Sequence, residues 1–197
     1  NIENYLGKRI YERDDITSEI GVVNSLVCTT SGGDVTSIEV NHYKGNSNIT
    51  LTGSLGDVML ESAKISLSYI KSNYKLFNID YKVFEDDIHI NVPNIAIKKD
   101  GPSAGISITT ALISDLANVE IPKNIAFTGE ITLRGNILKV GGIKEKIIGA
   151  YINNIDTVFI PKSNIIDLDN IPEEIKNKIK IIPVQKYTEI YDYIKRA

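Results

Sequence analysis

One serine and two lysines, each in an unusual local sequence, are the side chains whose types and spacing best suit covalent chemistry. Residues 98–105 read Lys-Lys-Asp-Gly-Pro-Ser-Ala-Gly, so Ser103 follows a Gly-Pro turn and begins an apolar helical pattern. Backbone N–H groups at a helix start lack intrahelical partners and favour negative charge, which suits an attacking serine oxygen and the oxyanion it creates. The same position also fits a plain helix cap or an anion-binding helix start. Ser103 is therefore a candidate nucleophile.

A serine hydroxyl is a weak nucleophile until a base takes its proton, and a neutral lysine can be that base. Residues 141–148 read GGIKEKII, which places Lys144 and Lys146 among isoleucines at the start of an expected helix. Burial lowers the pKa of a lysine by several units from its usual value of about 10.4. Successive helical positions turn by about 100°, so both lysines flank apolar residues and periodicity does not choose between them. A solvated Lys-Glu-Lys face is the structural alternative.

Other common site chemistries lack their residues in this sequence. His42, His89 and Cys28 are too few and too scattered for a zinc site, and no phosphate-binding G-x-x-x-x-G-K-[ST] pattern occurs. His89 could serve a Ser-His arrangement, but a lone histidine on a strand is more often structural. The single cysteine excludes an intrachain disulfide and favours a reducing compartment. We interpret Cys28 as a small buried hydrophobe.

The elements that must position these residues alternate between strands and helices after residue 55, which predicts an α/β or α+β fold with a mixed sheet. Before that point, β-branched runs at residues 21–30, 35–40 and 49–52 predict an antiparallel meander. The expected helices are residues 55–72, 103–116, 143–153 and 187–194. The further expected strands are residues 88–92, 125–128, 157–160 and 179–184, with a hairpin in residues 131–140.

Length and composition bound the organisation of the chain. The 197 residues fit one domain, with residues 1–18 as a polar arm or linker and residues 19–197 as the folded unit. The first residue is Asn1, which suggests a piece of a longer protein with any targeting signal upstream. No apolar run approaches the roughly 20 residues of a membrane span, so a soluble protein is expected. The net charge of −3 with no basic block gives no support to nucleic-acid binding.

Several motifs in register resemble the proteolytic domain of the Lon family of ATP-dependent proteases, and its soluble A-type branch in particular. Residues 99–105 (KDGPSAG) look like the nucleophile motif of the family, residues 128–135 (TGEITLRG) like its second block, and residues 141–146 (GGIKEK) like the block that supplies the lysine. The separation of 43 positions between Ser103 and Lys146 is similar to that of the family, which selects Lys146 over Lys144. The resemblance covers nearly the whole chain.

The resemblance implies a site, a fold and a reaction. Ser103 would form an acyl-enzyme and Lys146 would act as general base and then as general acid. The fold would be a single domain with a mixed sheet and packed helices, related to a domain found in a ribosomal protein. Thr128 would hydrogen-bond and aim Lys146. The other residues to which the resemblance gives nearby supporting or oxyanion-binding roles are Asp100, Glu130, His89, Gly101, Pro102 and Ala104.

The resemblance also implies partners. Substrates would be unfolded polypeptides, and the full-length protein would form a homo-oligomer, a hexameric ring, with ATP and Mg²⁺ bound in an upstream ATPase module. This chain itself is expected to hold no cofactor or metal and to contact no membrane. The bacterial cytoplasm is the expected location, with the mitochondrial matrix as alternative. The alternative function is a non-catalytic module of the same fold, used for assembly or nucleic-acid binding.

Overall fold

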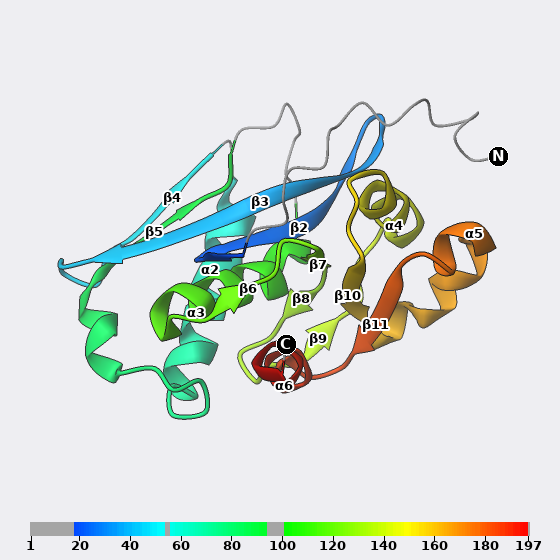
Figure 1. Ribbon diagram of the computed structural model, residues 1–197. Coiled ribbons are helices and arrows are strands. Elements are labelled where there is room, and N and C mark those ends of the chain that lie inside the picture. Colours follow the sequence, from blue (N-terminus) through cyan, green and yellow to red (C-terminus); the bar gives the residue numbers. More distant parts are fainter. Residues whose placement is uncertain (1–17, 54–55, 94–100, 197) are drawn as a thin grey trace.

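The computed structural model describes residues 18–53, 56–93 and 101–196, which form a mixed α/β fold built on a seven-stranded sheet with strand order β11-β10-β7-β2-β3-β5-β4 (Figure 1). The strands of this sheet are β2 (Val22–Thr29), β3 (Gly32–Tyr43), β4 (Ile49–Thr52), β5 (Asp87–Asn91), β7 (Ile125–Phe127), β10 (Thr157–Pro161) and β11 (Lys180–Val184). Two short pairs lie beside it, namely β1 (Glu19–Ile20) with β6 (Glu120–Ile121) and β8 (Glu130–Ile131) with β9 (Ile137–Leu138). The fold class and the main strands are those predicted from the sequence.

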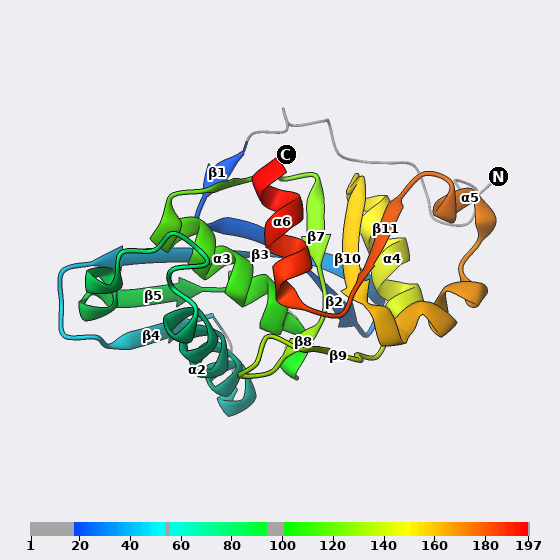
Figure 2. The ribbon, with the colours of Figure 1, turned by 90° about the horizontal axis from the view of Figure 1, so that it is seen from below.

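The helices cover both faces of the sheet. The α-helices are α2 (Asp57–Ser72), α3 (Gly105–Ala117), α4 (Ile143–Ile152), α5 (Glu173–Lys176) and α6 (Tyr187–Arg196), and the 3-10 helices are η1 (Tyr81–Glu85), η2 (Pro102–Ala104) and η3 (Lys162–Asn170). Seen from below, α2, α3 and α6 lie in front of the sheet and α4 lies behind it (Figure 2). The core divides in the same way, because α2, α3 and α6 share one apolar cluster and α4 and α5 share another.

The predicted antiparallel meander is wrong in its third strand. β2 and β3 form a long antiparallel hairpin, but β3 then pairs with β5, and β4 lies outside β5 as the edge strand. β4 runs parallel to β5, and the connection between them contains α2. Parallel neighbours require a crossover of this kind, whereas a meander needs only tight turns. Spacing along the chain could not reveal that the later strand inserts between the two earlier ones.

α4 is seated on the β2–β3 hairpin by two glycines that let backbones touch. A Cβ atom at Gly149 of α4 would lie 2.6 Å from the carbonyl oxygen of Gly33 and 2.7 Å from the amide nitrogen of Asp34. A Cβ atom at Gly33 would collide in turn with the backbone of Glu145. The apolar face of α4, with Ile143 and Ile147, is buried in the second core cluster. Both glycines are therefore required for α4 to lie at this depth.

None of the helices within the described ranges is long and apolar enough to cross a membrane.

Gly149→Ala should destabilise the fold although alanine favours helices over glycine by about 1 kcal/mol. The added methyl group forces α4 away from the hairpin, and overpacking of this kind costs typically about 1–3 kcal/mol. We expect urea unfolding to show a net loss of that order. Gly141→Ala is the control, because a Cβ atom at Gly141 meets open space and should leave stability unchanged. A neutral or stabilising effect of Gly149→Ala would contradict the close contact.

Candidate active site

Ser103 lies in the short η2 turn that leads directly into α3. Gly101 precedes it with φ of 120°, a backbone conformation that glycine adopts far more readily than other residues, and Pro102 occupies the first position of the turn. The carbonyl oxygen of Ser103 accepts a 2.8 Å hydrogen bond from the amide of Gly129. Ser103 is itself only partly buried and lines a pocket. The backbone of Ser103 is thus held by a hydrogen bond, and the residue faces the pocket.

Lys146 enters the same pocket from α4, on the other face of the sheet. Its side chain is buried, with 3% of its surface exposed, and its Nζ donates a 3.1 Å hydrogen bond to the hydroxyl of Thr128. Lys144, two positions earlier, is exposed and does not line this pocket. The structure therefore separates the two lysines that helical periodicity could not distinguish.

Burial changes the acid–base behaviour of Lys146. Desolvation lowers the pKa of its ammonium group below the usual lysine value, and the nearby thiol of Cys28, when ionised, acts in the opposite direction. A lowered pKa leaves more of the amine neutral near physiological pH, and only a neutral amine can accept a proton from a serine. Lys146 is therefore a buried amine with a lowered pKa, and it does not belong to a solvated Lys-Glu-Lys face.

The dipeptide Thr128–Gly129 connects the two candidate residues. Thr128 follows β7 directly, is fully buried, and donates its amide to the carbonyl of Phe159 at 3.1 Å. Its hydroxyl accepts the hydrogen bond from the Lys146 amine, and the next amide along the chain, that of Gly129, donates to the carbonyl oxygen of Ser103. The carbonyl of Gly129 also accepts a 3.0 Å hydrogen bond from Ile106 in α3. Two consecutive residues at the end of one strand therefore set the positions of both Ser103 and Lys146.

The pocket shared by these residues has a volume of about 470 Å³. Its lining combines partly buried or exposed positions, Ser103 among the partly buried ones, with deeply buried and mostly apolar ones on β3, on α2 and after β5. The lining residues are Ser25, Val27, Cys28, Thr36, Ile38, Met59, Val92, Gly101, Pro102, Ser103, Ala104, Glu130, Lys139, Val140, Gly141, Gly142 and Lys146.

The remaining predicted site residues fall into three groups. Glu130, Gly101, Pro102 and Ala104 line the pocket, although Pro102 has no amide hydrogen and so cannot donate to an oxyanion. Asp100 lies outside the described residues, as do residues 1–17 of the predicted arm. The third group is His89 alone.

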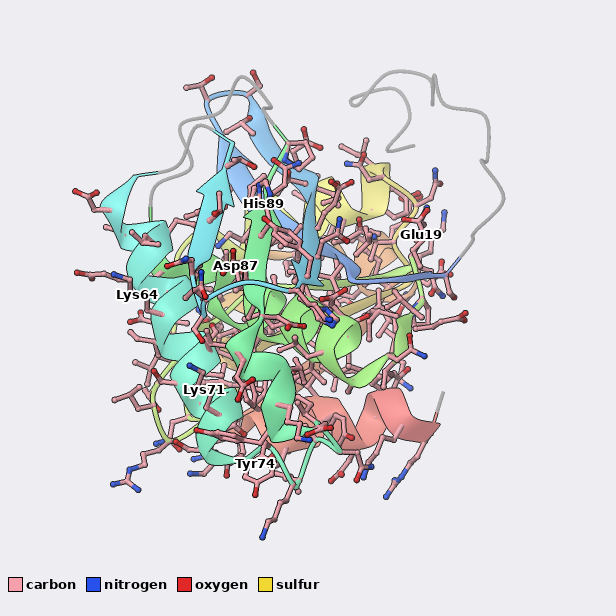
Figure 3. The ribbon with its side chains drawn as sticks, turned by 90° about the vertical axis from the view of Figure 1, so that its left-hand side faces the viewer. Glu19, Lys64, Lys71, Tyr74, Asp87 and His89 are labelled. Atoms are coloured by element: carbon pink, nitrogen blue, oxygen red, sulfur yellow. The ribbon has the colours of Figure 1, made fainter. Side chains whose placement is uncertain are left out.

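His89 lies on β5 toward the β4 edge of the sheet, and it is not among the residues that line the pocket (Figure 3). Its Nε2 is 2.9 Å from the hydroxyl of Thr52, which donates in turn to Asn91 at 2.8 Å. Within the described residues, these contacts belong to the surface of the β3–β5–β4 part of the sheet. They give His89 no direct connection to Ser103 or Lys146.

The expectation that Cys28 is a buried hydrophobe is wrong. Cys28 is exposed and lines the pocket, with its Sγ 3.7 Å from the carbonyl oxygen of Gly142. It lies near the end of β2 opposite Gly33, which has no side chain to cover it. Gly142 has φ of 70°, and a Cβ atom there would collide with the cysteine sulfur. An apolar run in the sequence gives no sign that its last residues extend past the end of β7, which pairs only with Asn24 and Ser25 of β2.

Sequence reasoning also missed Thr36, which is buried and lines the pocket. A threonine in a strand pattern carries no signal of its own, because threonine is common in strands for steric reasons. In the described part of the chain, no group of three or more His, Cys, Asp or Glu side chains is placed to hold a metal ion.

The family model and the similar curated proteins that we compared with this sequence all point to one protein family. Residues 1–195 match the family model described as Lon protease (S16) C-terminal proteolytic domain. Similar proteins include Lon protease of Mycoplasma mycoides subsp. mycoides, 48% identical over 98% of this chain, and Lon protease of Mesomycoplasma hyopneumoniae, 49% identical over 98%. Lon protease of Clostridioides difficile is 47% identical over 98% of the chain. The chain spans about a quarter of the length of these relatives, 22% to 25%.

Lys146→Met should stabilise the fold, because methionine fills a similar volume without a buried amine to desolvate. The wild-type lysine has a folded-state pKa below its unfolded value, so the unfolded chain binds more protons between those two values, and wild-type stability rises with pH in that window. We expect Lys146→Met to gain roughly 1 kcal/mol at neutral pH, or about 2–4 °C in Tm.

This gain should shrink as the pH rises from the lowered pKa of Lys146 toward about 10.4. Urea unfolding at several pH values measures it. Lys144→Met is the matched control from the exposed face of the same helix, and it should leave the stability at neutral pH nearly unchanged. A Lys146→Met variant that is less stable than wild type at neutral pH would contradict the desolvation argument.

Proposed function

This chain belongs to the Lon protease family, as its C-terminal proteolytic domain, and from that premise we propose that it hydrolyses peptide bonds through a Ser103–Lys146 pair. The observation that carries the proposal is the buried Lys146 amine, held by Thr128 in the pocket that Ser103 lines. A buried lysine with a lowered pKa beside a serine at a helix start is a recognised arrangement for nucleophilic catalysis.

The reaction begins when the Ser103 hydroxyl attacks the carbonyl carbon of the scissile bond. The Lys146 amine accepts the hydroxyl proton as the new C–O bond forms, and the carbonyl oxygen becomes an oxyanion. Backbone N–H groups at the start of α3 are suited to hold that charge, because the first turn of a helix has free donors and a positive dipole end. Of the predicted donors, Gly101 and Ala104 possess the required amide hydrogen.

The tetrahedral species then breaks its C–N bond, and the Lys146 ammonium returns the proton to the leaving amine. The acyl group stays on Ser103 as an ester. In the second half a water molecule attacks this ester, Lys146 takes the proton of the water, and Ser103 leaves with a proton from Lys146. Thr128 keeps the amine aimed at the reacting atoms in both halves, because it accepts a hydrogen bond from the neutral and the charged form alike.

The rest of the proposal concerns the activity, location and assembly of the longer protein from which this chain would come. We propose an ATP-dependent endopeptidase that degrades unfolded polypeptides in the bacterial cytoplasm as a hexameric ring. The sequence contains no G-x-x-x-x-G-K-[ST] pattern, so this chain does not offer the phosphate cradle that ATP and Mg²⁺ would need. ATP would therefore bind to an ATPase module outside this chain, and residues 1–18 would be the arm toward it.

Ser103→Ala and Lys146→Met should each lower the rate of cleavage of an unfolded protein by roughly a thousandfold or more, because members of a catalytic pair act as a unit. The double variant should be no worse than either single one. Lys144→Met is the matched control and should retain activity within about twofold. The assay follows fragments of a denatured model substrate with the full-length enzyme and ATP. Near-normal cleavage by Lys146→Met would exclude it as the base.

Thr128→Val should lower kcat by about 10–100-fold with little change in KM, because the side chain acts on the lysine and not on the substrate. The valine has the same shape but cannot accept the hydrogen bond from Lys146. Thr128→Ser restores the hydroxyl and should recover most of the activity. A loss confined to KM, or no rescue by serine, would show that Thr128 does not position the base.

A further inference from the structure

The pocket beside Ser103 has a deeply buried end that the proposed chemistry does not use. It is formed by Ile38 of β3, Met59 of α2 and Val92 after β5, each at most 5% exposed, together with Thr36 of β3. The residues around the nucleophile are more open, as Gly101 and Ser103 are only partly buried. A substrate polypeptide bound at Ser103 can therefore place one side chain in the buried end of the pocket, between mostly apolar walls.

Thr36 is the exception among these walls. Its side chain is 3% exposed, and its hydroxyl has no hydrogen-bond partner among the residues that the structure describes. Its cross-strand neighbour Ser25 shows the contrast, because the hydroxyl of Ser25 receives a 2.8 Å hydrogen bond from Ser107. An unsatisfied buried hydroxyl costs about 1–3 kcal/mol, and valine would fill the same place without that cost. The unpartnered hydroxyl thus points to a polar group that enters the pocket from outside.

We propose that this buried end receives the side chain of the residue whose carbonyl Ser103 attacks, and that Thr36 hydrogen-bonds the polar end of that side chain. The Cα atom of that residue is bonded directly to the attacked carbon, so its side chain is the nearest to the cavity at the moment of attack. The walls favour an apolar stem, and the single hydroxyl favours an uncharged polar end. Glutamine and threonine fit this description. The inference rests on the proposed peptidase function and names a determinant of its substrate preference.

The expected selectivity follows from the buried hydroxyl. An apolar side chain of the same shape leaves the Thr36 hydroxyl without a partner in the buried end of the pocket, whereas a polar one gives it a hydrogen bond. Sites that hydrogen-bond a substrate group reject analogues that lack it much more strongly than apolar pockets reject a change in size. Thr36 should therefore raise the preference for threonine over valine and for glutamine over methionine. These pairs differ little in shape, so size does not enter the comparison.

The test measures kcat/KM of the full-length enzyme on peptides that are identical except for that residue. We expect Thr36→Val to lower the Thr/Val and Gln/Met ratios by about tenfold, which corresponds to about 1.4 kcal/mol. Thr36→Ser keeps the hydroxyl and should keep the wild-type ratios. Thr50→Val, an exposed strand threonine outside the pocket, is the matched control and should change neither ratio.

Unchanged ratios in an active Thr36→Val enzyme would overturn the proposal. So would a shift that appears only when the residue on the leaving-group side is varied. If wild type cleaves none of the peptides, the proposed function fails separately. The preference is then tested by binding of the same peptides to Ser103→Ala and to Ser103→Ala/Thr36→Val. A preference for polar peptides that is lost with Thr36 sustains the subsite, and equal binding refutes it.

Discussion

The hydrogen bond between the buried Lys146 amine and the Thr128 hydroxyl links the parts of the site that the fold keeps apart. The two helices that supply Ser103 and Lys146 cover opposite faces of the sheet, so no direct contact between helices can align them. Alignment comes instead from the end of β7, where Thr128 receives the lysine and Gly129 holds the serine backbone. β7 lies inside the sheet, between β2 and β10, so it is held on both sides and can position residues from both helical layers.

Keeping a lysine in this place has an energetic consequence that the surrounding packing must offset. Desolvation of the amine opposes folding, and one hydrogen bond to a neutral hydroxyl recovers only part of it. The close seating of α4 through Gly33 and Gly149, with Ile143 and Ile147 in the core, supplies the compensating burial. Gly33 of β3, together with Gly149 and the two isoleucines of α4, is thus connected to the proposed chemistry, although none of these residues is a member of the proposed catalytic pair.

Much of this arrangement was predictable from periodicity and turn residues. The helical pattern that starts at Ser103 and the one that contains Lys146 were both found, because each has an apolar stripe of the correct period. Periodicity did not choose between Lys144 and Lys146, since that choice depends on where α4 lies relative to β7, and only the spacing shared with the family favoured Lys146. The place of β4, the exposure of Cys28 and the unpartnered hydroxyl of Thr36 depend in the same way on which strands are neighbours.

Because Ser103 and Lys146 come from two different layers of the fold, the pair can form only late in the synthesis of the chain. Ribosomes make the chain from its N-terminus, so Ser103 emerges 43 residues before Lys146. Until α4 has been made and has docked behind the sheet, Ser103 lacks the base that the proposed mechanism assigns to it, and a serine without a base is a poor nucleophile. Under the proposed mechanism, an unfinished or half-folded copy would therefore not cleave other polypeptides or its own chain.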